Sequence, residues 1–150
     1  MRSVLFVCHG NICRSPMAEY VMKDLVKKAH AEDRFHIESA AATTEELGND
    51  VYPSAKRALA LHHVPCPPRR ARQMTKADYD RFDMLLGMDR ENIRMMRSIC
   101  GGDPEGKISL LLSHTPRGGE VADPWYTGDF EAAWDDILLG CECLLKGGNE

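Results

Sequence analysis

Four short hydrophobic runs alternate with segments of helical periodicity, and this alternation restricts the fold more than any other feature. The runs cover residues 3–8, 35–39, 82–88 and 107–112. The first is almost continuously apolar, which is typical of a strand buried on both faces. Strands separated by helices require right-handed crossovers, so the alternation predicts an α/β fold with a four-stranded parallel sheet flanked by helices.

The segments between the runs carry start and stop signals of helices. Ser15 followed by Pro16 predicts a helix start with Ser15 as the N-cap. Thr75 opens a sequence that resembles a capping box, and Asp89 is expected to cap a helix that ends at Gly101. The expected helices cover residues 15–31, 49–63, a short stretch from 75, residues 89–101 and the region from about 129 onward.

Length and composition limit the class of protein. The chain has 150 residues, which suggests a single domain over residues 1–150. A net charge of −4 argues against a nucleic-acid binder, and no segment approaches the length of a membrane span. Six cysteines without a secretory signal indicate reduced thiols, so we expect a cytoplasmic protein.

A candidate anion-binding loop follows the first strand. Cys8 ends the strand, Arg14 comes after five further residues, and Ser15 follows at the expected helix start. Inward-facing amides, the helix N-terminus and the Arg14 fork can together hold a tetrahedral anion. Gly10 and Asn11 tolerate the left-handed conformations that such a curl requires. The loop residues are His9, Gly10, Asn11, Ile12, Cys13, Arg14 and Ser15.

The same features are expected to activate Cys8. A cationic side chain, a helix N-terminus and inward amides all favour a thiolate over a thiol. Ser15 is expected to donate a hydrogen bond to the sulfur. The position of Cys8 at the carboxyl end of a parallel strand agrees with a ligand site, because such sheets bind ligands beyond those ends.

Several segments resemble the low-molecular-weight protein tyrosine phosphatase family. They are VCHGNICRSPMAE, IESAA, ARQMTKADYDRFDMLLGMDREN and ADPWYTGDF, which together cover nearly the whole chain. The resemblance implies a flavodoxin-like three-layer fold and hydrolysis of phosphotyrosine in protein substrates. It also implies a phosphocysteine intermediate on Cys8, without a metal or other cofactor.

The resemblance assigns further roles by position. Asp123, in a loop after the last strand, corresponds to the family's general acid. Trp125 and Tyr126 are expected to flank the pocket opening, with a partly buried loop anchor as the alternative. Cys13 corresponds to a redox partner of Cys8, although a buried structural thiol is an equally good interpretation.

Two positions depart from the family pattern. Arg69 stands where many members have a histidine that supports the phosphate loop, which puts the rigidity of this loop in question. Glu45 stands where an aromatic side chain often lines the pocket. A carboxylate there makes aryl specificity less certain and favours cationic residues near the phosphotyrosine.

Three other functions are compatible with parts of the pattern. Arsenate reductases share the fold and the loop, but they use cysteines near the third strand, and residues 81–96 contain none. Protein arginine phosphatases tend to have threonine where this chain has Ile12, which favours tyrosine. A phosphoprotein-binding module without activity is the third alternative, although every expected catalytic residue is present.

Overall fold

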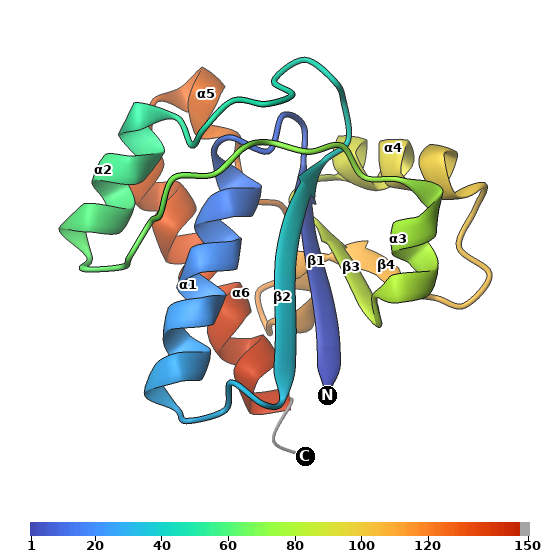
Figure 1. Ribbon diagram of the computed structural model, residues 1–150, viewed down its shortest axis with the longest axis horizontal. Coiled ribbons are helices and arrows are strands. Elements are labelled where there is room, and N and C mark those ends of the chain that lie inside the picture. Colours follow the sequence, from blue (N-terminus) through green and yellow to red (C-terminus); the bar gives the residue numbers. More distant parts are fainter. Residues whose placement is uncertain (148–150) are drawn as a thin grey trace.

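The computed structural model describes residues 1–147, which form the predicted four-stranded parallel sheet (Figure 1). The strands are β1 (Arg2–Cys8), β2 (Phe35–Ala41), β3 (Met84–Gly87) and β4 (Ile108–Leu110). All neighbours pair in parallel, in the order β2-β1-β3-β4. The expected domain boundary at residue 150 lies outside the described residues.

Helices cover both faces of this sheet and complete a three-layer α/β fold (Figure 1). Helices α1, α2 and α6 lie on one face, and α3 and α4 lie on the other. The helical elements are α1 (Arg14–Lys28), α2 (Pro53–Leu61), α3 (Lys76–Arg81), α4 (Arg90–Cys100), η1 (Leu111–His114), α5 (Pro124–Thr127) and α6 (Phe130–Gly147). Among the described residues, no helix has the length and apolar character needed to cross a bilayer.

Strand β1 supplies side chains to the cores on both faces of the sheet, which explains its continuous apolar sequence. Val4 and Phe6 belong to the core beneath α1 and α6, whereas Leu5 and Val7 belong to the core beneath α3 and α4. All four side chains are almost completely buried. The alternation follows from the two-residue period of a strand.

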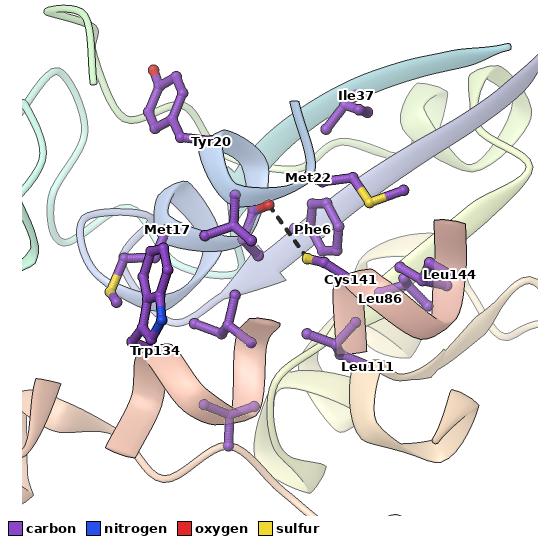
Figure 2. Packing of buried hydrophobic residues seen from close by; sticks show 14 of the residues in the cluster. Phe6, Met17, Tyr20, Met22, Ile37, Leu86, Leu111, Trp134, Cys141 and Leu144 are labelled. Atoms are coloured by element: carbon purple, nitrogen blue, oxygen red, sulfur yellow. Dashed lines mark hydrogen bonds between the residues drawn. The ribbon is translucent and has the colours of Figure 1, made fainter. Parts of the chain in front are cut away.

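The larger core joins α1 and α6 to the sheet (Figure 2). Phe6, Met17, Trp134 and Leu144 pack together there, and the Cys141 thiol donates to the carbonyl oxygen of Ala18 at 3.7 Å. Burial raises the pKa of Cys141 well above its usual range. This cysteine is therefore a neutral packing residue.

Two of the predicted helix starts are confirmed and one is wrong. Thr75 and Asp89 are N-caps, and each forms a capping box with the residue three positions later. Helix α1, however, begins at Arg14 with Cys13 at its N-cap, and no side chain caps it. Ser15 does not cap the helix because its hydroxyl is used by Cys8 and Asn11.

Two helical segments were not expected from the sequence. The fourth strand ends at Leu110, and residues that were expected to continue it form the 3₁₀-helix η1. Asp123 was expected in a loop, but it is the N-cap of the short helix α5, and its side chain accepts from the amide of Trp125. This hydrogen bond orients the Asp123 carboxylate without the help of a ligand.

The sheet topology determines where a ligand can bind. Strand order runs from β1 to β2 on one side and from β1 to β3 on the other, so β1 and β3 flank the switch point. Open α/β sheets bind ligands beyond the carboxyl ends of the strands at this point. Cys8 is the last residue of β1 and therefore lies there.

Candidate active site

The loop between Cys8 and Arg14 has the predicted curled form, although its two special residues act differently. Asn11 adopts a left-handed conformation with φ of 60°. Gly10 does not take a positive φ, contrary to expectation. A Cβ atom at this position would lie 3.1 Å from Cγ of Glu46, a tight contact that a small shift of the Glu46 side chain would have to relieve. Gly10 therefore lies close against the Glu46 side chain.

The buried side chain of Asn11 holds the loop in place through three hydrogen bonds. Its Nδ2 donates to Oγ of Ser15 at 2.7 Å and to Oγ of Ser39 at 2.9 Å. Its Oδ1 accepts from the amide of Arg72 at 3.3 Å. Sequence reasoning did not assign a role to Ser39, although its position near the carboxyl end of β2 is a signal that could have found it.

Cys8 lies at the base of this loop, and the residue is 3% exposed. Oγ of Ser15 is 2.9 Å from it, and the amide of Ser15 donates to it at 3.4 Å. A thiolate can only accept, so with Cys8 ionised the Ser15 hydroxyl donates to sulfur. This contact has the geometry expected from the sequence.

Arg14 is buried, yet its charge is well compensated. Nη1 donates to Oδ2 of Asp89 at 2.8 Å and to the carbonyl of Val121 at 2.9 Å, and Nη2 lies 3.4 Å from Oδ2 of Asp123. Burial alone would lower the pKa of Arg14, but the negative charges of Cys8, Asp89 and Asp123 raise it. Arg14 is therefore a permanent cation between the thiol and the carboxylate.

Asp89 has a second function that sequence reasoning missed. Its Oδ1 caps α4 by accepting from the amide of Asn92 at 2.8 Å, while Oδ2 orients Arg14. The residue follows β3 almost directly, on the same sheet edge as Cys8. Its position beside the switch point was therefore readable, but its pairing with Arg14 depends on tertiary structure.

Arg69, the departure from the family pattern, contacts the loop directly. Its guanidinium donates to the carbonyl oxygen of Asn11 and, at 3.3 Å, to that of Asn49. Arg69 thus joins the phosphate loop to the segment before α2. The loop has a cationic support at this position in place of the histidine.

A pocket opens above the loop and brings together the residues singled out in the sequence. It has a volume of about 130 Å³, which is below the roughly 300–1,000 Å³ of drug-sized ligand sites. It therefore suits a small charged group. Its lining combines Cys8, His9, Gly10, Ile12, Cys13, Arg14 and Asp123 with Glu45, Glu46, Trp125 and Tyr126.

The pocket rim is both aromatic and acidic. The side chains of Trp125 and Tyr126 are 52% and 83% exposed. Glu45 pairs with Nε2 of His9 at 2.6 Å, so the carboxylate is held across the opening by a loop residue. Glu46, which sequence reasoning did not single out, adds a second carboxylate to the lining.

Cys13 is also part of the pocket lining, but its chemistry differs from that of an activated thiol. Burial, followed by the negative charges of Cys8 and Asp123, raises the pKa of Cys13 to about 12. The side chain is therefore a neutral thiol near pH 7. Cys8 and Cys13 are both free cysteines.

Comparisons with known proteins agree with this geometry. Residues 3–149 match the family model described as low molecular weight phosphotyrosine protein phosphatase. The low molecular weight protein-tyrosine-phosphatase YfkJ of Bacillus subtilis is 40% identical over 147 residues, which cover 97% of this chain and 94% of YfkJ. The low molecular weight phosphotyrosine protein phosphatase of Homo sapiens is 36% identical over 150 residues, with coverages of 97% and 94%.

Solved structures show the same relationship. The crystal structure of YfkJ matches with a TM-score of 0.94 at 39% identity, over 98% of this chain and 94% of that chain. The crystal structure of a Drosophila arginine phosphatase matches with a TM-score of 0.89 at 29% identity, over 100% and 99%. Because the family model and these relatives span nearly the whole sequence, the chain belongs to the low molecular weight phosphotyrosine protein phosphatase family.

Proposed function

We propose that this protein hydrolyses phosphotyrosine in protein substrates through a covalent phosphocysteine. One observation carries the proposal: the Cys8 thiol, the Arg14 guanidinium and the Asp123 carboxylate face one small pocket, with Arg14 touching Asp123. Phosphoryl transfer to a side chain requires a nucleophile, a cation that holds the phosphoryl oxygens and a proton donor for the leaving group, and these three residues can supply them.

In the first step, the Cys8 thiolate attacks phosphorus and the bond to the phenolic oxygen breaks. Protonated Asp123 gives its proton to this oxygen, and tyrosine leaves. Arg14 and the amides of residues 9–14 hold the phosphoryl oxygens. These groups supply the positive field, so no metal or other cofactor is invoked.

In the second step, water attacks the phosphocysteine. Asp123, now a carboxylate, takes a proton from this water, and the Cys8 thiolate leaves as phosphate forms. The Ser15 hydroxyl, 2.9 Å from the sulfur, stabilises the thiolate in both steps by donating a hydrogen bond. The sulfur thus ends the cycle in the state in which it began.

The experiment is phosphate release from a phosphotyrosyl peptide at mildly acidic pH in the presence of a chelator. We expect turnover by the wild type, background rates for Cys8→Ser, and a loss of about 10²–10⁴-fold for Asp123→Asn. Cys143→Ser, at a half-buried cysteine of α6 outside the pocket, is the matched control and should retain full activity. Equal rates for Cys8→Ser and wild type would exclude Cys8 as the nucleophile.

A second candidate substrate is phosphoarginine. The two carboxylates in the pocket lining, Glu45 and Glu46, suit a guanidinium, and the Drosophila relative is named an arginine phosphatase. Ile12 and the exposed aromatic rim favour the tyrosine ring instead. Phosphoarginine and phosphotyrosine peptides of the same sequence, compared by kcat/KM, separate the two substrates.

We further propose that the protein works in the cytoplasm. All six cysteines are free, and four of them are buried. A reducing compartment keeps such thiols reduced. The pairing of Cys13 with an oxidised Cys8 stays a prediction.

A further inference from the structure

A hydrophobic surface track leads away from the catalytic pocket toward α2. A second pocket adjoins the first and shares Trp125 with it, and its other lining residues include Tyr52 and Phe130. This second pocket continues into an open groove of about 700 Å³ between α2 and the junction of α5 with α6. Ser54, Gly128 and Phe130 line both of these hollows, so the groove adjoins the second pocket as that pocket adjoins the first.

The track concentrates the exposed hydrophobic side chains of the molecule. Five large hydrophobic side chains are exposed among residues 1–147. Two of them, Leu61 and Trp125, line the track, and a third, Tyr126, lines the catalytic pocket where the track begins. Leu61 is 67% exposed. Exposed apolar side chains that gather beside a pocket are typical of a binding surface.

The floor of the track is fixed to the phosphate loop. The amide of Tyr52 donates to the carbonyl oxygen of Ile12 at 2.9 Å. The Tyr52 ring meets the edge of Trp125 at a centroid distance of 4.9 Å and stacks on Phe130 at 6.1 Å. A ligand on these rings therefore lies in a defined position relative to the reacting phosphorus.

Charged groups along the groove are already engaged by neighbours. Arg57 donates to Oγ of Ser54 at 2.8 Å, and Glu131 pairs with His62 at 2.8 Å. Asp129 accepts from the amide of Ala132 at 2.9 Å at the start of α6. Beside these charged groups, the groove offers an apolar side chain contacts with Ala58, Ala60, Leu61 and Phe130.

We propose that this track, from Trp125 over Phe130 to Leu61, binds the polypeptide segment on one side of the phosphotyrosine in a protein substrate. A bulky apolar side chain of that segment, such as leucine, lies in the groove against Leu61. The inference rests on the proposed function and adds a specificity subsite to it. The position of the track beside the catalytic pocket identifies the occupant as substrate, because a polypeptide whose phosphotyrosine fills that pocket has to run over the adjoining surface.

The test compares peptides with a small aryl phosphate. A set of phosphotyrosyl peptides carries a single leucine at successive positions on either side of the phosphotyrosine, with alanine elsewhere. We expect the wild type to prefer leucine at one or two positions on one side by roughly tenfold in kcat/KM, which corresponds to burial of part of one leucine side chain.

The variant Leu61→Glu should abolish this preference while leaving hydrolysis of p-nitrophenyl phosphate unchanged. Leu47→Glu is the matched control, because Leu47 is also an exposed leucine, at 50%, and does not line the track. An unchanged leucine preference in Leu61→Glu, or no preference in the wild type, overturns the subsite alone. Absence of turnover of both substrates by the wild type overturns the proposed function, and the subsite with it.

Discussion

At the scale of single residues, the site is built from buried polar groups whose partners come from distant parts of the chain. Arg14 is 2% exposed and would be costly to bury alone. Asp89 and Asp123 compensate its charge from the loops after β3 and before α5. The same two contacts therefore orient Arg14 and hold it beside Asp123, the proposed proton donor.

Arg69 offers a direct test of how the phosphate loop is held. Arg69→Ala removes the donor to the Asn11 carbonyl, and we expect kcat/KM for p-nitrophenyl phosphate to fall by roughly 10–100-fold, because small displacements of positioning groups are expensive. Arg69→Lys should restore part of the loss. Arg70→Ala, at the exposed neighbouring arginine, is the control. Similar rates for Arg69→Ala and Arg70→Ala would rule out this support.

At the scale of elements, the sequence predicted correctly those helix starts that depend only on neighbouring residues. Thr75 and Asp89 were readable as caps because each capping box is completed three residues later. Ser15 looked equally suitable, but tertiary contacts with Cys8 and Asn11 take its hydroxyl. The short helix α5 begins at Pro124 and spans one turn, too little for periodicity to reveal.

The candidate site likewise has a local part, which the sequence predicted, and a part that only tertiary structure brings together. The loop from Cys8 to Arg14 is contiguous, so its sequence was sufficient to predict its curled form, while its binding of an anion stays a prediction. The partners of that loop, Asp89, Ser39 and the carbonyl of Val121, lie in three other segments. Their pairing follows from strand order and register, which one sequence does not specify.

Gly140 tests how closely α6 packs against η1. A Cβ atom at this position would lie 2.5 Å from Cγ of Leu111. We expect Gly140→Ala to lower the free energy of unfolding by roughly 1–2 kcal/mol, because the cost of overpacking exceeds the gain in helix propensity. Denaturant unfolding measures the change.

Gly147→Ala is the matched control for this prediction. It makes the same substitution in the same helix, where nothing lies within 4 Å of the added atom. It should be neutral or slightly stabilising. Equal effects of the two substitutions would show that α6 and η1 are not in close contact at Gly140.

At the scale of the whole molecule, acid stability should depend on carboxylates that are hydrogen-bonded in the folded state. Burial alone would raise the pKa of Asp103, but hydrogen bonds from the Tyr79 hydroxyl and the amides of Lys107 and Ile108 hold it below its usual value. In Glu38, burial is likewise outweighed, by His36, Arg72 and Arg81.

A lowered folded-state pKa stabilises the fold above the unfolded pKa of about 4, and this stabilisation is lost as the pH falls through the folded value. We therefore expect the free energy of unfolding to decline below about pH 4. Asp103→Asn should lower the free energy of unfolding by roughly 1–3 kcal/mol at pH 7, and it should make the decline of this free energy at acidic pH less steep. Asp80→Asn, at an exposed aspartate of α3, should change neither. A parallel acid decline in Asp103→Asn and wild type would contradict this role.

The central claim is that Cys8 carries the phosphoryl group during turnover, and acid-quenched peptide mapping by mass spectrometry tests it most directly. The sample is Asp123→Asn mixed with p-nitrophenyl phosphate, because nitrophenolate leaves without a proton while hydrolysis of the intermediate is slowed. The account predicts a phosphoryl group on Cys8, and none in the double variant with Cys8→Ser. Phosphate release with the phosphoryl group on another residue, or with Cys8 never modified, would contradict it.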